Sequence, residues 1–324
     1  MEQPSGDADP ESLPDPAAPR APRPLWLRAL RWLLLAAIIA YVAWKLTDIG
    51  WRDLASSLPA NPLFYLLHVG GFFILPLTET GIARTIWRRP FRGALPMFFK
   101  KRALNNVVIG FSGDLYQLAW MKARMDLPVR RIVAGIKDNE ILSGAATMLV
   151  TVAIIAILYA AAQSALLARI ITLPGSALLW IGVGLAAVAV VVLRFRRTIF
   201  WIGMDQALTV LALHIFRIVA ALGVVALQWE VAVPVGPWSL WLSFLAVQVL
   251  VQQLPLIPSR DLLFLGLALE LSGAAGVPEA QLSAMFVMLT ILKQLSNYAA
   301  LGITSLIPAA DIVGPPVEAR TATS

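Results

Sequence analysis

Long runs of apolar residues constrain this chain more than any other feature. Ile141–Ala162 and Ala177–Leu193 contain no charged side chain, and each approaches the roughly 20 residues that a helix needs to cross the hydrocarbon core of a bilayer. Of the 324 residues, 59% are hydrophobic and 14% are charged, whereas soluble domains are about 45–50% apolar and about 25% charged. This excess of apolar residues excludes an ordinary soluble domain. It predicts an all-α, polytopic transmembrane helical bundle.

The ends of the chain differ in composition from the part between them. Residues 1–24 include seven prolines and five acidic residues against two arginines, a composition typical of a disordered segment. We therefore expect a disordered, cytoplasmic tail at 1–24, a membrane domain at 25–308 and a flexible C-terminal tail at 309–324.

Positive charge is concentrated next to the apolar runs. The chain carries a net charge of +7 although its first 24 residues are acidic. Lys and Arg are enriched in the cytoplasmic loops of membrane proteins, which explains this excess without a nucleic-acid partner. We expect an inner-membrane protein with a cytoplasmic N-terminus, whose basic stretches at 84–102 and 122–137 lie beside the anionic leaflet. There they would also attract anionic lipid head groups.

The apolar runs and their charged flanks predict about seven or eight spans. The expected spans are 25–46, 62–83, 141–162, 177–193, 207–227, 238–254 and 280–306.

Residues 103–121 present a conflict between length and charge. The segment is long enough to cross a bilayer, and Asp114 is its single charge, but basic stretches lie on both sides of it. A crossing would place one of these stretches outside, whereas a re-entrant segment keeps both in the cytoplasm. Non-helical backbone at membrane depth is tolerated where protein or a wet cavity surrounds it. We favour re-entry, and crossing is the alternative.

A second interrupted segment lies before the last span. Pro255 and Pro258 break an apolar run, and Leu262–Leu269 provides only a short apolar stretch before Glu270. The pattern predicts two half-helices. Ser112–Leu115 and Ser259–Leu262 share the pattern Ser-x-Asp-Leu, and interrupted segments at corresponding positions of two halves indicate the central site of a transporter. We therefore consider a possible inverted repeat.

Polar and ionisable residues at membrane depth are candidates for a functional site, because burying them in lipid is costly. The substrate-path candidates are Asn105, Asn106, Ser112, Gly113, Asp114, Ser259, Arg260, Asp261, Glu270 and Lys293, followed by Arg217, Asp138 and Glu140. Each has a structural alternative as well.

These structural alternatives are helix capping, charge pairing and interfacial placement. Ser112 and Asp114 could cap a half-helix, and Asp138 and Glu140 are expected to stabilise the start of a span. Arg260 could bind a lipid phosphate or neutralise a carboxylate. For Lys293, Glu270 is the expected partner.

Three further residues receive a structural interpretation. Glu79 is expected at the interface. His68 and His214 stand among apolar neighbours and are expected to pack in the core.

The order of these features is specific enough to compare with a known family. An Asn-containing segment with a Gly/Ser turn is followed by a basic stretch and a charged cluster at a long span. Much later, an Ile-Pro-Ser turn at 257–259 and the sequence Gly276–Ala280 lead to a final span that carries Lys293. Over residues 25–308 the chain resembles the lysylphosphatidylglycerol synthase transmembrane, or flippase-like, family. It departs from the family pattern at 110–114, which lacks an arginine, and at 258–261, which lacks glycines.

This resemblance implies a divergent member that retains the lipid-translocating part and lacks the soluble aminoacyl-transferase domain. We therefore expect a non-enzymatic protein that translocates, or helps to translocate, a lipid or lipid-linked intermediate. The expected partners are membrane lipids with anionic or phosphate-bearing head groups.

Two alternatives remain open at this point. One is an accessory subunit that works with envelope-biosynthesis enzymes, and the other is a membrane-embedded lipid transferase. The chain has no cysteine and two histidines, and it lacks a P-loop. We expect no catalytic residue, no metal site and no cofactor, and the sequence leaves the oligomeric state open.

Overall fold

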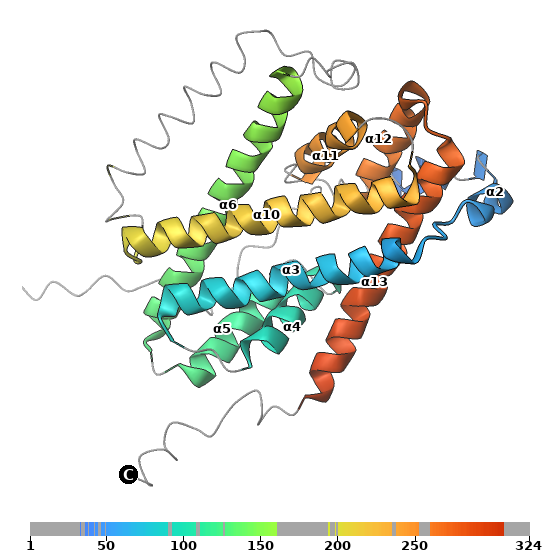
Figure 1. Ribbon diagram of the computed structural model, residues 1–324. Coiled ribbons are helices and arrows are strands. Elements are labelled where there is room, and N and C mark those ends of the chain that lie inside the picture. Colours follow the sequence, from blue (N-terminus) through green and yellow to red (C-terminus); the bar gives the residue numbers. More distant parts are fainter. Residues whose placement is uncertain are drawn as a thin grey trace, which may run out of the picture.

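The computed structural model describes residues 50–89, 93–107, 111–125, 127–160, 200–234, 238–252 and 260–307, together with residues 194 and 198 and some residues between 33 and 48. Helix is the regular secondary structure of these residues, as predicted. The helices with named bounds are α2 (Trp51–Ser56), α3 (Pro62–Trp87), α4 (Ala94–Val107), α5 (Ser112–Arg124), α6 (Val129–Ala160), α10 (Met204–Ala232), α11 (Trp238–Gln252), α12 (Arg260–Ala275) and α13 (Glu279–Leu306) (Figure 1).

Four described helices are long and apolar enough to cross a membrane, which indicates a membrane protein. They are α3, residues Val129–Ile157 of α6, α10 and α13, and they correspond to four of the predicted spans. The tails and the spans predicted at 25–46 and 177–193 lie wholly or mostly outside the described residues. The number of spans and the inverted repeat stay predictions.

Two helices differ in length from the prediction. The described part of α11 has 15 residues, about 22 Å of helix, which is short of the roughly 30 Å of the hydrocarbon core. The helix that contains the apolar stretch 262–269 does not end at Glu270, because α12 continues to Ala275. Gly276 then has a positive φ of 67°, and Pro278 precedes α13.

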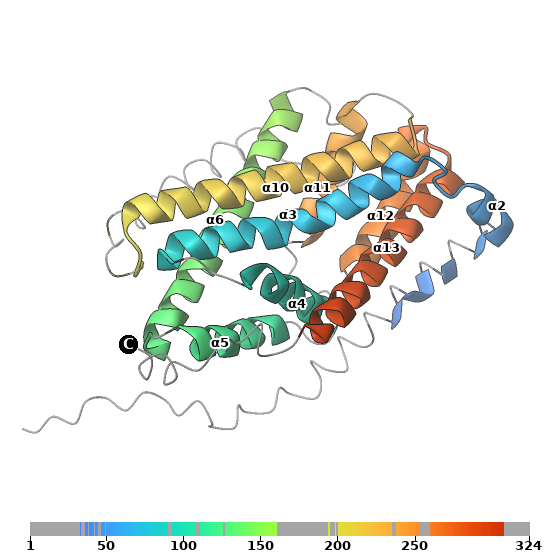
Figure 2. The same ribbon diagram turned by 60° about the horizontal axis from the view of Figure 1, so that its bottom comes forward.

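The pair α3 and α10 forms the centre of the bundle. The two helices lie side by side in opposite directions, and α6 and α13 cross them near opposite ends (Figures 1 and 2). Gln206 Nε2 donates to the backbone oxygen of Thr85 at 2.7 Å, and Gln228 Nε2 donates to that of Phe64 at 2.8 Å. Each end of α3 is therefore bound by a different glutamine of α10.

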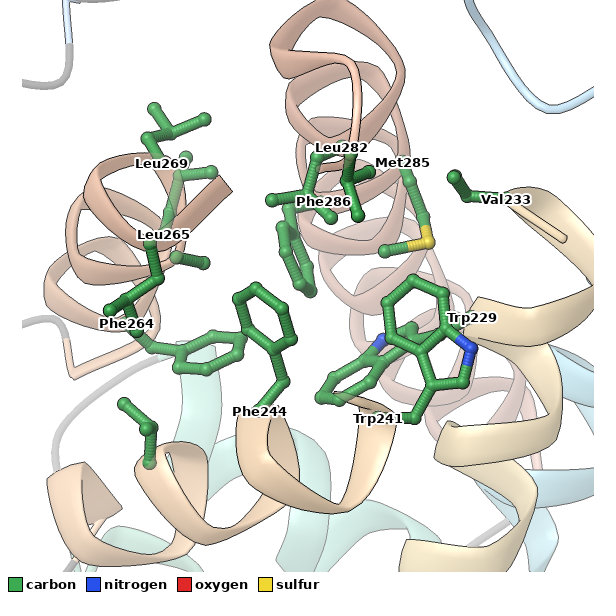
Figure 3. Close-up of a cluster of buried hydrophobic side chains, with 14 of the residues drawn as sticks. Trp229, Val233, Trp241, Phe244, Phe264, Leu265, Leu269, Leu282, Met285 and Phe286 are labelled. Carbon is green, nitrogen blue, oxygen red and sulfur yellow. The ribbon is translucent and has the colours of Figure 1, made fainter. Parts of the chain in front are cut away.

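An aromatic core joins α10, α11, α12 and α13. Trp229 stacks on Phe264 with 5.9 Å between the ring centroids, and its edge contact with Phe286 is 5.4 Å. Trp241 and Phe244 of α11 complete the cluster, with the rings directed toward one another (Figure 3). Large rings gain much from burial, so this core holds the short helices α11 and α12 against the two long ones.

Helices α4 and α5 form a short hairpin beside α3, α6 and α13 (Figure 2). They have 14 and 13 residues, about 20 Å of helix each, so neither is long enough to cross a bilayer. The predicted segment 103–121 thus includes the end of α4 and most of α5. Its first helix begins at Ala94, so Lys100, Lys101 and Arg102 lie within a helix and not in a basic loop.

Candidate functional site

A cavity of about 240 Å³ lies where α3, α4, α10, α11, α12 and α13 meet. Most of its wall is apolar and includes Leu67, Phe72, Val224, Trp229, Phe264 and Phe286. The polar side chains that line it are His68, Arg102, Gln228, Gln248, Asp261, Thr290 and Lys293. The cavity is therefore amphipathic, with charged groups contributed by three helices.

An ion pair between α12 and α13 forms one part of the polar lining. Lys293 Nζ is 2.5 Å from Asp261 Oδ2, and Gln252 Nε2 donates to Asp261 Oδ1 at 3.0 Å. Both charged residues were predicted from the sequence. The predicted pairing of Lys293 with Glu270 is wrong, because Glu270 accepts a hydrogen bond from Tyr41 and Asp261 occupies the position beside Lys293.

Arg102 is the other cation of the cavity. Its Nη1 donates to the backbone oxygen of Phe72 at 2.7 Å, and its guanidinium lies 4.1 Å from the centroid of the Phe72 ring. Among the described residues, no carboxylate lies within ion-pair distance of it. Burial, together with the nearby positive charge of Arg217, lowers the pKa of Arg102 to about 10. The group is still charged at neutral pH.

A buried network connects α3, α6 and α10. Arg217 Nη1 lies 3.0 Å from Glu79 Oε1, and Arg217 Nη2 donates to Ser143 Oγ at 3.1 Å. Asn139 Nδ2 lies 3.5 Å from Glu79 Oε2, and Asn139 Oδ1 lies 3.1 Å from His214 Nε2. Glu79 is thus buried and not interfacial, and His214 belongs to a polar network and not to an apolar core.

A second network surrounds Lys101 on α4. Its Nζ lies 2.9 Å from Asp114 Oδ1 and 3.8 Å from Glu140 Oε1. Burial alone would lower the pKa of Lys101, but the carboxylates of Glu79, Asp114 and Glu140 outweigh this effect and raise it. The ammonium group is therefore held in the charged form by a surplus of nearby carboxylates.

The predicted residues of the hairpin fix its geometry. Asn105 Oδ1 accepts from the backbone N–H of Gly113 at 2.7 Å, and Asn105 Nδ2 lies 3.3 Å from Asp114 Oδ2. Ser112 Oγ donates to the backbone oxygen of Leu104 at 2.9 Å, and Asn106 donates to that of Arg102. Ser112 and Asp114 do not cap α5, because Phe111 occupies the N-cap position and the side chain that accepts from the first turn is that of Asn105.

Gly113 is required by the close approach of α4 and α5. A Cβ atom at this position would lie 2.1 Å from the backbone oxygen of Lys101 and 2.8 Å from Asn105 Oδ1. We expect Gly113→Ala to lower the free energy of unfolding by about 1–3 kcal/mol, the usual cost of overpacking, because backbone atoms must move. Thermal denaturation of the purified variant in detergent measures this.

The matched control for this change is Gly144→Ala. A Cβ atom at Gly144 meets nothing within 4 Å, so that variant should be as stable as the parent chain. Equal melting temperatures for Gly113→Ala and Gly144→Ala would show that the hairpin tolerates separation.

Asp138 and Glu140 lie inside α6 and not at its start. The helix begins at Val129, so the predicted role at a helix end is wrong for both. Asp138 Oδ2 accepts from the backbone N–H groups of Trp201 and Ile202, at 2.7 and 3.0 Å. Asp138 thus anchors the segment before α10, whereas Glu140 contributes to the network around Lys101.

Arg260 and Ser259 are the remaining predicted residues. Arg260 Nη1 donates to the backbone oxygen of Gln252 at 2.8 Å, so it joins α12 to α11 and does not line the cavity. Ser259 lies outside the described residues. Within the described ranges, no group of three or more His, Asp or Glu residues is placed to hold a metal ion.

Comparison with known proteins identified no relative of this chain. No protein-family model matches the chain, and no curated protein or solved structure matches it. The resemblance described from the sequence therefore stays a prediction.

Sequence reasoning did not identify Arg102, Glu79 and His214. The sequence placed Arg102 in a basic stretch, and no local feature indicates that its side chain lines a cavity. The sequence contained one signal for Glu79. A carboxylate between the apolar residues of a span requires a cationic partner, and Arg217 is a cation in the middle of another span.

Proposed function

We propose that this chain is a membrane protein that translocates, or helps to translocate, a lipid or lipid-linked intermediate with an anionic head group. The observation that carries the proposal is the cavity with an apolar wall and a half-buried guanidinium, Arg102, that has no carboxylate partner among the described residues. Burying an uncompensated charge is costly. An anionic ligand would remove that cost.

The chemistry of the lining fits a phosphate-bearing group. A guanidinium binds phosphate oxygens through two parallel N–H donors, and Lys293 supplies a second cation on the same cavity. The volume of about 240 Å³ is below the roughly 300–1,000 Å³ of pockets that enclose drug-sized ligands. The cavity therefore suits a head group, while acyl chains would extend along the apolar helices.

The short helices support this proposal. Helices α4, α5 and α12 are each shorter than the hydrocarbon core is thick, and two of them supply residues to the cavity lining. Interrupted helices that supply a central site are typical of transporters. We also propose, from charge and resemblance, a re-entrant α4–α5 hairpin, an inner-membrane location with a cytoplasmic N-terminus, and membership of the flippase-like family.

Leaflet exchange in liposomes tests the proposal. The purified chain is reconstituted with fluorescently labelled phosphatidylglycerol or phosphatidylcholine, and dithionite quenching measures how fast inner-leaflet label reaches the outside. We expect exchange of the anionic lipid well above that of protein-free liposomes, and slower exchange of the zwitterionic one. Rates equal to those of protein-free liposomes for both lipids would contradict the proposal.

A further inference from the structure

Gln248 of α11 has hydrogen-bonding groups that no other described residue uses. Its side chain lines the cavity and is half-buried, and it forms no hydrogen bond with another described residue. An amide has two N–H donors and an oxygen acceptor, and a polar group in apolar surroundings is costly unless it is hydrogen-bonded. The cavity therefore offers a ligand both a donor and an acceptor at this position.

The other polar side chains of the cavity have partners within the protein. These contacts join Gln228 to the backbone of Phe64, Thr290 to that of Phe286, His68 to Ser296, and Asp261 to Lys293. The guanidinium of Arg102 donates one described hydrogen bond, to the backbone oxygen of Phe72, although such a group has five N–H donors. Among the described residues of the lining, Arg102 and Gln248 thus have the most unused donors.

Arg102 and Gln248 come from different parts of the bundle. Helix α4 packs mainly on α13, α5 and α3, whereas α11 packs mainly on α12, α6 and α10. Both residues nevertheless line one small cavity of about 240 Å³, so a head group that fills it contacts both. Such a ligand carries an anionic group for the guanidinium and a second polar group for the amide.

The charges and rings of the cavity disfavour an ammonium group as that second group. The described lining has two cations and a single carboxylate, Asp261, which is already paired with Lys293. The aromatic rings do not form a cage for a cation, because Trp229 and Phe264 stack on each other and are 0% and 3% exposed. A hydroxyl group is uncharged and both donates and accepts, so it fits the amide of Gln248.

We propose that Gln248 binds a hydroxyl group of the translocated head group while Arg102 binds its phosphate. The substrate class is then a lipid phosphodiester of a polyhydric alcohol, such as glycerol, inositol or a sugar. A phosphodiester carries one negative charge, which matches the one cation of the cavity that has no carboxylate partner among the described residues. This inference rests on the proposed function and names the kind of head group that it takes.

Two lipids of equal charge test the role of Gln248. Dioctanoyl phosphatidylglycerol has hydroxyl groups on its head group, whereas dioctanoyl phosphatidylpropanol has an alkyl head group of the same length without them. Calorimetry with the purified full chain in detergent gives the Kd of each lipid. We expect the parent chain to bind phosphatidylglycerol roughly three- to tenfold more tightly, which is the effect of about one neutral hydrogen bond.

Gln248→Leu should remove this preference. Leucine suits the apolar helix α11, and the change breaks no hydrogen bond between described residues. The affinity for phosphatidylglycerol should fall to that for phosphatidylpropanol, which should stay unchanged. The control Gln294→Leu removes an exposed glutamine of α13 that does not line the described cavity, and it should keep the preference of the parent chain.

Three results would overturn the inference. Equal affinity of the parent chain for the two lipids would do so, and this measurement requires no variant. A Gln248→Leu chain that still prefers phosphatidylglycerol would show that another residue binds the hydroxyl group. Failure of the parent chain to bind either lipid would also overturn the inference. Leaflet exchange, measured separately in liposomes, then decides whether the proposed function fails with it.

Discussion

Arg217→Leu should lower the free energy of unfolding by about 3–5 kcal/mol, because it leaves the carboxylate of Glu79 buried without its cation. The ion-pair distance is 3.0 Å, and the two side chains are 13% and 8% exposed. Ser143 also loses its contact with the guanidinium. Thermal denaturation in detergent, followed by circular dichroism, should show a large fall in the melting temperature.

The exposed pair Arg88–Asp205 provides the matched control. Its N–O distance of 3.1 Å is close to the 3.0 Å of the buried pair, but its side chains are 69% and 74% exposed. Exposed pairs contribute about 0–1 kcal/mol. Arg88→Leu should therefore change stability little. The double variant Glu79→Leu/Arg217→Leu should recover much of the loss, since no unpaired charge remains. Equal effects of Arg217→Leu and Arg88→Leu would contradict the buried pairing.

Arg102→Gln should reduce exchange of labelled phosphatidylglycerol roughly ten- to hundredfold. A hydrogen bond to a charged group contributes about 1.5–3 kcal/mol, and each 1.4 kcal/mol corresponds to about a factor of ten. Glutamine removes the charge and keeps a polar amide at this position. The dithionite assay in liposomes measures the rate, and Arg102→Lys should lose less because it keeps the charge.

Lys100 gives the control for this prediction. It precedes Lys101 on α4 and lies 5.3 Å from the ring centroid of Tyr116, and it does not line the described cavity. Lys100→Gln should leave exchange of the anionic lipid unchanged. If both variants lose activity equally, the effect is one of overall basic charge and the cavity has no special role.

The positions of the long helices could be predicted from the sequence because the signal is local. A long apolar run with few charged residues suffices to indicate a membrane helix, and α3, α6, α10 and α13 each contain such a run. The predicted first residues of these helices were less accurate. Helix α6 extends to Val129 because one face of its charged first part packs against protein, with Trp87 against Gly135 and Asp138 bound to the backbone before α10.

The candidate site could be predicted only in part, for a related reason. Asp114, Asp261 and Lys293 were found because each is ionisable within an apolar or interrupted segment. Glu79 and Arg217 are 138 positions apart, and nothing local to either residue indicates the other. The predicted partner of Lys293 was wrong because Asp261 and Glu270 both belong to α12, and only the packing of α12 against α13 decides between them.

The sequence by itself determined that this chain is helical and apolar enough for a membrane, because hydrophobicity acts on each segment independently of its neighbours. The tertiary structure alone decided that Lys101 contacts carboxylates while Arg102 lines the cavity, that Glu79 pairs with Arg217, and that this cavity lies among six helices. Charge pairing depends on the distance between side chains, and that distance is fixed only when the helices pack.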